Sequence, residues 1–236
     1  MEKTNTFLLS LAGGGGLIAA LLRLWMRSMA DEKGLLPRNT LPSILLVLVS
    51  LGVMGVWVYF CLRKRGKKGY RANFPASPSG ALGCLCAAVG IALILTPGHG
   101  ALGILALISG ILSILALLLL AYHRYQGTQP TVLLHSALCI YFVFRLLNLY
   151  RVWCASPQVD NYAFPLLASV CVLLACFGDA AFTINSGRIR SHTFLHLAAV
   201  FFCLAALPGS DAAWTYLALG AYMATDLCTP QQRRAA

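Results

Sequence analysis

Apolar stretches, each about long enough to cross a bilayer, follow one another along almost the whole chain and leave no segment for a soluble domain. A hydrocarbon layer is about 30 Å thick, which about 20 helical residues span. Backbone groups inside it find no water, and these runs are too long and too continuously apolar for barrel strands. We therefore predict an all-α polytopic integral membrane protein, a single transmembrane domain over 1–236. About eight transmembrane helices are expected near 6–27, 42–62, 79–96, 101–122, 131–152, 164–184, 192–207 and 213–228.

The link after the second span is strongly basic, and basic links stay on the cytoplasmic side of a membrane. Its positive residues are Arg63, Lys64, Arg65, Lys67, Lys68 and Arg71. Counting spans outward from this link predicts that both termini are cytoplasmic, in a bacterial-type inner membrane. The same six residues are expected to contact anionic lipid headgroups. Because the net charge of +11 lies in membrane-flanking links and not on a folded basic face, nucleic acid is not expected as a partner.

The two halves of the chain share several features. Arg23 and Arg145 lie in the outer parts of spans 1 and 5, a proline heads the following span in each case, and spans 3 and 7 both contain Ala-Ala-Val. Residues 1–122 and 123–236 are therefore expected to form two parallel four-helix repeats, related by a pseudo-two-fold axis along the membrane normal. The alternative is that low-complexity apolar sequence aligns easily with itself.

Small residues at 3-4-3 spacing mark one side of the third and fourth spans. In lipid, such stripes let helix backbones approach closely, which replaces the hydrophobic drive that water would supply. We expect these two spans to close on each other through Gly80, Gly83, Ala87 and Gly90 on one and Gly103, Ala106, Gly110 and Ser113 on the other.

Two arginines inside the apolar spans indicate an outer site. An intramembrane charge costs at least about 2.5 to 3.5 kcal/mol, so such residues are functional candidates. Arg145 has Tyr141 and Asn148 at helical spacing on the same side, and Arg23 is its repeat mate. Together they predict an arginine-lined site for a carboxylate, a phosphate or a small anion. Alternatively, Arg23 extends to the headgroups and Arg145 bonds helix carbonyls or a loop aspartate.

Histidines and aspartates gather at the inner ends of the last four spans. The topology places His135, Asp179, His192, His196 and Asp226 in one layer near the cytoplasmic face. The two histidines at i,i+4 spacing stand on one face of a helix, and imidazole and carboxylate are ordinary zinc ligands. A zinc site of His135, Asp179, His192 and His196 would allow hydrolysis by a metal-bound hydroxide. The alternative is interfacial histidines with Asp179 hydrogen-bonded in the bundle.

The order of these residues is similar to that in the intramembrane metal hydrolases that include alkaline ceramidases and adiponectin receptors. The similarity covers His135-Ser136, then Asp179, then the His192 and His196 pair. It does not extend to the spacing or to the surrounding sequence, so the chain is not assigned to that family. The resemblance implies zinc as the cofactor and a lipid as the substrate.

Three functions follow. The first is a small-solute or ion permease, channel or membrane subunit without a cofactor, in which Arg145 binds an anionic group and Asp179 is a proton- or cation-coupled site. The second is the zinc-dependent lipid hydrolase. The third is a non-catalytic scaffold or sensor, in which the basic link at 63–71 docks a cytoplasmic partner. A homo-oligomer or a partner membrane subunit is compatible with each.

Overall fold

In the computed structural model, all regular secondary structure of the described residues is helical. The structure describes residues 2–30, 40–64, 69–95, 100–153 and 162–228. The helices are α1 (Glu2–Ser28), α2 (Leu41–Arg63), α3 (Tyr70–Asn73), α4 (Pro78–Leu93), α5 (Gly100–Gln126), α6 (Val132–Trp153), α7 (Ala163–Thr183), α8 (Ile189–Ala205) and α9 (Ala213–Cys228).

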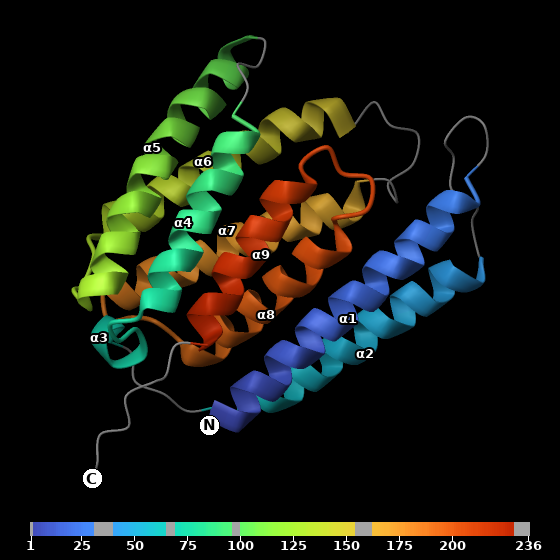
Figure 1. The fold of residues 1–236 in the computed structure, drawn as a ribbon, viewed down its shortest axis with the longest axis horizontal. Coiled ribbons are helices and arrows are strands. Elements are labelled where there is room, and N and C mark those ends of the chain that lie inside the picture. Colours follow the sequence, from blue (N-terminus) through green and yellow to red (C-terminus); the bar gives the residue numbers. More distant parts are fainter. Residues whose placement is uncertain (1, 31–39, 65–68, 96–99, 154–161, 229–236) are drawn as a thin grey trace.

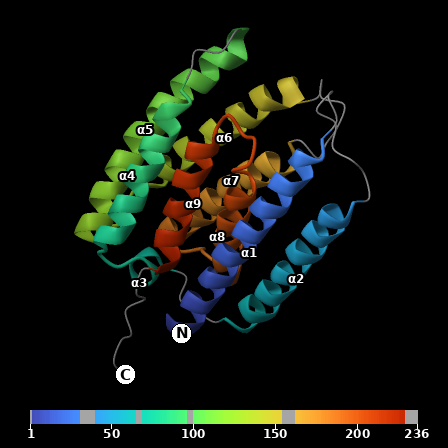
Figure 2. The same ribbon diagram turned by 45° about the vertical axis from the view of Figure 1, so that its right-hand side comes forward.

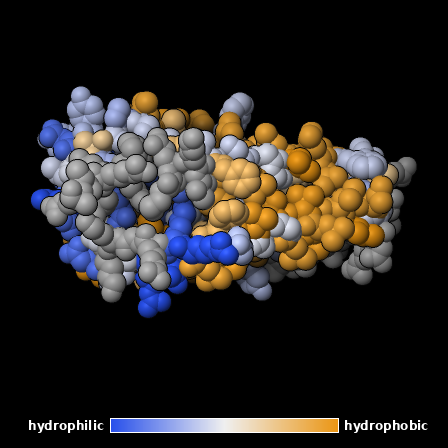
Figure 3. Space-filling model, turned by 90° about the horizontal axis from the view of Figure 1, so that it is seen from below, coloured by the Kyte–Doolittle hydropathy of each residue, from blue (hydrophilic) through white to orange (hydrophobic). Residues whose placement is uncertain are grey.

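The lengths and composition of the helices confirm the predicted all-α membrane class. Helices α1, α2, α5, α6 and α7 are long and apolar enough to cross a bilayer, and α4 and α8 are shorter apolar helices. Helix α9 has 16 residues. The space-filling view in Figure 3 shows hydrophilic residues gathered at one end and apolar residues over most of the remaining described surface. The molecule is therefore built as a membrane-embedded bundle.

Local sequence sets several helix ends. Pro78 begins α4, where its missing N–H removes no helical hydrogen bond, and the Ser77 hydroxyl caps this helix by accepting from the Gly80 amide at 3.3 Å. After α5, Gly127 has a φ of +67°. Asn185, with a φ of 58°, reverses the chain after α7, as asparagine often does. The short link that Asn185 begins brings the end of α7 beside the start of α8.

Helices α8 and α9 form the centre of the bundle and pack on each other. The α1–α2 hairpin packs on α8, the α4–α5 hairpin packs through α4 on α9, and α6 and α7 connect α5 with α8. Figures 1 and 2 show the two hairpins on opposite sides of the bundle. The start of α1, the short helix α3 and the end of α9 lie at the same end (Figure 1). We call this the α3 end.

Two of the small residues of α4, Gly83 and Gly90, face α9, which corrects the expectation that they close α4 on α5. A Cβ atom added to Gly90 would lie 2.5 Å from the Cβ of Ala218 in α9, and Gly83 likewise meets α9. Helix α5 does pack beside α4, and a Cβ atom added to its Gly110 would meet the side chain of Leu95, just after α4, as well as the ring of Tyr141 in α6. Spacing locates a small stripe but not the neighbour that uses it.

The internal repeat stays a prediction. Helices α7 and α8 pack closely, whereas α2 and α4, their counterparts in the first half, form no comparable contact among the described residues. A two-fold relation between 1–122 and 123–236 has to accommodate this difference.

We predict that Gly90→Ala lowers the free energy of unfolding by about 1–3 kcal/mol, because the new methyl group overpacks the α4–α9 contact. The measurement is the thermal unfolding midpoint in detergent. Gly52→Ala is the matched control, since an added Cβ there has nothing within 4 Å and alanine favours a helix. Equal midpoints for the two variants would contradict the packing described above.

Candidate functional site

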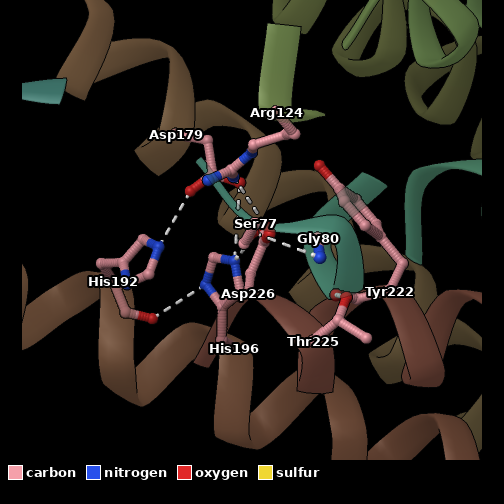
Figure 4. Close-up of polar contacts among 9 residues, drawn as sticks. All are labelled: Ser77, Gly80, Arg124, Asp179, His192, His196, Tyr222, Thr225 and Asp226. Carbon is pink, nitrogen blue, oxygen red and sulfur yellow. Dashed lines mark hydrogen bonds and ion pairs between the residues drawn. The ribbon is translucent and has the colours of Figure 1, made fainter. Parts of the chain in front are cut away.

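Five ionisable side chains meet inside the bundle near the α3 end, as Figure 4 shows. Asp179 comes from the end of α7, His192 and His196 from the start of α8, Asp226 from the end of α9, and Arg124 from the end of α5. Each residue is at most 5% exposed. Charges in so little water require partners, and these side chains are one another's partners.

Asp179 lies against both imidazoles. Its Oδ1 is 3.0 Å from Nε2 of His192, and its Oδ2 is 3.5 Å from Nε2 of His196. The two imidazole rings, one helical turn apart, have centroids 3.9 Å apart. One ligand atom from each of the three residues lies within 4.8 Å of the other two. The three side chains therefore direct one oxygen and two nitrogens at a common point.

The backbone fixes the tautomer of His196. Its Nδ1 lies 3.0 Å from the carbonyl oxygen of His192. Because a carbonyl only accepts hydrogen bonds, Nδ1 carries the hydrogen, and in the neutral ring Nε2 then has the free lone pair. The nitrogen that faces Asp179 is thus the one prepared to bind a cation.

The contacts of Asp179 with the two imidazoles are close but fall outside strict hydrogen-bond geometry. Both carboxylate oxygens of Asp179 and the Nε2 atoms of both histidines lack a partner in hydrogen-bond geometry among the described residues. Oδ1 of Asp179 and Nε2 of His192 thus lie 3.0 Å apart without the alignment of a hydrogen bond. Ligands around a shared metal ion have this arrangement.

A second carboxylate stands next to the group. Asp226 accepts a hydrogen bond from Nη2 of Arg124 at 2.9 Å, and the same oxygen lies 3.8 Å from Nε2 of His196. The guanidinium Cζ of Arg124 is 4.0 Å from the ring centroid of Phe74 and 5.5 Å from that of Tyr70. Aromatic faces attract a cation, so they hold Arg124 over the ion pair.

The charges of these five side chains do not cancel. The two aspartates contribute two negative charges and Arg124 one positive charge. A buried site of low dielectric strongly favours neutrality, so one more positive charge is needed. Within the described group, a proton on an imidazole would supply it, as would a bound cation.

Aromatic residues from the α3 segment and from α7 enclose His192. The rings of Phe74 and Phe182 each lie 5.3 Å from its imidazole, edge to face. Tyr70, on α3, is buried beside them, and burial raises the pKa of its hydroxyl, which therefore stays protonated. These rings keep bulk water away from the ionic group.

A small cavity of about 10 Å³ reaches this group from the α3 end. It is lined by Asn5, Asn73, Ile189, His192, Thr193, Asp226 and Leu227. The volume corresponds to about one water molecule. Lys64 bridges two residues of its wall, because Nζ donates to Asn5 Oδ1 at 2.5 Å and to Thr193 Oγ1 at 3.3 Å. Water fits beside His192 in this conformation and a lipid chain does not.

The structure brings together three of the four residues expected to bind zinc. His135 is completely buried and interacts electrostatically with Asp179, but it is not among the ligand atoms that converge. Neither of its ring nitrogens has a hydrogen-bond partner in the described part of the chain. The group is therefore Asp179, His192 and His196, with His135 nearby.

The two predicted outer arginines have separate environments. Arg145 is 7% exposed, its Cζ lies 5.4 Å from the ring centroid of Tyr216, and it forms a side-chain hydrogen bond with Tyr141. Its Nη1 has no hydrogen-bond partner among the described residues. Asn148 is half-buried one turn further along α6.

Arg23 is anchored on α8 and α7. Its Nη1 donates to the carbonyl of Ala205 at 2.7 Å, and its Cζ is 4.8 Å from the ring centroid of Phe164. A cavity at this end of the bundle is lined by Arg23 but not by Arg145.

The predicted headgroup cluster is described only in part. Arg63 is exposed and lies over the ring of Tyr59, Arg71 is exposed, and Lys64 is turned inward as stated above. Arg65, Lys67 and Lys68 lie outside the described residues.

Sequence reasoning missed Arg124, Tyr70 and Phe74. Arg124 had been counted only as one more positive charge in a cytoplasmic link, although it directly continues the apolar run of its span. That continuity was the available signal. Nothing in the sequence indicated that Tyr70 and Phe74, in a basic link, would fold back over the ionic group.

In comparisons with known proteins, no family model, curated protein or solved structure matches this chain.

We predict that Arg124→Gln destabilises the fold by about 3–5 kcal/mol, because it removes the buried guanidinium that pairs with the Asp226 carboxylate. The double variant Arg124→Gln/Asp226→Asn should recover most of this loss. Unfolding midpoints of the two single variants and the double variant form a double-mutant cycle. Additive effects of the two substitutions would show that the pair is not coupled.

Proposed function

We propose that the protein is an intramembrane zinc-dependent hydrolase whose substrate is a lipid. The observation that carries this proposal is the convergence of Asp179, His192 and His196, with ligand atoms within 4.8 Å of one another and almost no exposure. Two histidines and a carboxylate are a known catalytic zinc set that leaves a fourth position for water.

The surroundings of the three residues support a metal over a simple ion pair. A metal-binding histidine commonly donates its other ring N–H to a carbonyl or a carboxylate, which fixes its orientation. His196 does so to the carbonyl of His192. A bound cation is one of two ways to supply the missing positive charge, the other being a proton on an imidazole.

Zinc supplies a Lewis acid and lowers the pKa of a bound water to about 7. The chain would supply the rest of the chemistry. Asp226, held in place by Arg124, lies beside His196 and is positioned to accept a proton from a water in the group. Phe74 and Phe182 exclude bulk water, and the protonated hydroxyl of Tyr70 is a hydrogen-bond donor for a substrate oxygen. The location inside a helical bundle favours a substrate that already resides in the bilayer.

The orientation belongs to the same proposal. With the α3 end at the cytoplasmic face of a bacterial-type inner membrane, both termini are cytoplasmic, and the described residues Arg63 and Arg71 lie at the headgroups of that face. Binding of anionic headgroups at the 63–71 link stays a prediction. Association with a second copy of the chain or with a partner membrane subunit also stays a prediction.

We predict that the protein purified from zinc-replete cells contains about one zinc per chain, measured by elemental analysis. Asp179→Asn and His196→Gln each remove a ligand and should reduce the zinc content about tenfold or more. His123→Gln is the matched control, because His123 bonds Thr128 outside the group. His135→Gln should also retain zinc. A wild-type protein with less than about 0.1 zinc per chain would contradict the proposal.

A permease or channel is the second candidate, and Arg145 favours it. This arginine is buried in the bundle, and its Nη1 lacks a hydrogen-bond partner in the described residues, so it can bind an anionic group that passes through. Under this reading Asp179 is the coupled site.

The permease reading predicts that Arg145→Gln abolishes anion uptake into proteoliposomes, whereas zinc content and lipid hydrolysis by the same variant stay at wild-type levels. Arg151→Gln, an exposed arginine further along α6, is the control. Proteoliposomes of the wild type that take up no anion would eliminate the permease.

A further inference from the structure

A larger cavity lies at the end of the bundle opposite to the ionic group. It has a volume of about 270 Å³ and is bounded by α1, α2, α7 and α8. Leu167 of α7 lines it, twelve residues before Asp179, which is about 18 Å along the helix at about 1.5 Å per residue. The cavity is thus a separate place in the fold, and the hydrolase proposal makes no use of it.

The cavity arises because α2 packs loosely. Helix α2 contacts α1 and, to a smaller extent, α8, and it lies at the edge of the bundle in Figures 1 and 2. Its cavity-lining Leu51 is 63% exposed, and the neighbouring Leu48 is 59% exposed. In a bilayer, such apolar exposure faces lipid. The cavity therefore adjoins the lipid phase.

One part of the cavity is cationic. Arg23 and Arg27 are one turn apart on α1 and both line it. The Nη1 of Arg23 donates to the carbonyl of Ala205 at 2.7 Å, and Nη2 of Arg27 donates to the carbonyl of Gly209 at 3.0 Å. These carbonyl groups hold both guanidinium groups at the wall of the cavity. The residues that line the cavity in the described chain include no Asp or Glu.

Apart from Ser43 and Ser50, the rest of the wall is apolar. Leu51, Met54 and Leu167 continue it away from the arginines. A cavity of about 150 Å³ accommodates benzene, so one of about 270 Å³ accommodates a larger group, such as a segment of an acyl chain. The cavity thus combines two phosphate-binding side chains with an adjacent apolar wall.

We propose that this cavity is a binding site for an anionic phospholipid of the leaflet at this end of the bundle. The phosphate binds Arg23 and Arg27, and one acyl chain lies along Leu51, Met54 and Leu167. An anionic amphiphile matches both parts of the wall, whereas a soluble anion would leave the apolar part bare and a zwitterionic lipid would bring its own cation to the arginines.

Native mass spectrometry of lipids retained by the purified protein tests this proposal. The protein is exchanged into detergent with equal amounts of phosphatidylglycerol and phosphatidylcholine. Phosphatidylglycerol should be retained about tenfold over phosphatidylcholine, as expected for charge-assisted hydrogen bonds to its phosphate where no ammonium competes. Millimolar inorganic phosphate should not displace it.

Two matched pairs of variants locate the site. Leu51→Trp fills the cavity and should abolish the preference, whereas Leu48→Trp, on the same helix but outside the cavity lining, should keep it. Arg27→Gln should reduce the preference at least severalfold, and Arg151→Gln should not. Because Arg27 is exposed, this change tests the charge in a folded protein.

Equal retention of the two lipids by the wild type would overturn the proposal, as would displacement by phosphate alone or an unchanged preference in both Leu51→Trp and Arg27→Gln. Zinc content and hydrolysis should be the same in all four variants. The failure of this site and the failure of the hydrolase are therefore distinguishable.

Discussion

The buried contact of the Asp179 carboxylate with two imidazoles is the interaction on which the rest of the structure depends. An aspartate in a bundle of apolar helices is tolerated only with close partners, and His192 and His196 lie within 3.5 Å of its oxygens. The short turn at Asn185 brings the end of α7 beside the start of α8, which makes this contact possible. The ion pair of Asp226 and Arg124 adjoins this contact at His196.

Much of the fold and part of the site were predictable. Spans follow from composition because lipid leaves the backbone only the helix. The meeting of Asp179 with His192 and His196 followed from topology, since polar residues at the same depth of neighbouring spans face the interior. The depth of a residue in the membrane does not give the direction in which it points around its helix axis. For this reason His135 lies outside the converging ligand atoms, and Gly83 and Gly90 of α4 face α9.

Other features depend on contacts between segments that sequence spacing does not report. Phe74 covers the ionic group because it packs with α3 against Arg124 and His192, although the surrounding sequence is typical of an exposed basic link. Arg23 and Arg145 looked like a pair, yet Arg23 is held by a carbonyl of α8 and Arg145 by tyrosines of α6 and α9. The result is a molecule with an ionic group at one end and a separate cationic cavity at the other.

The central claim is that Asp179, His192 and His196 bind zinc together, and X-ray absorption at the zinc edge of the purified protein tests it most directly. The account predicts a first shell of nitrogen and oxygen at about 2.0–2.2 Å, with the outer-shell scattering of two imidazoles. In Asp179→Asn this two-imidazole signal should be lost. A shell dominated by sulfur at about 2.3 Å would place the metal on cysteines and contradict the account.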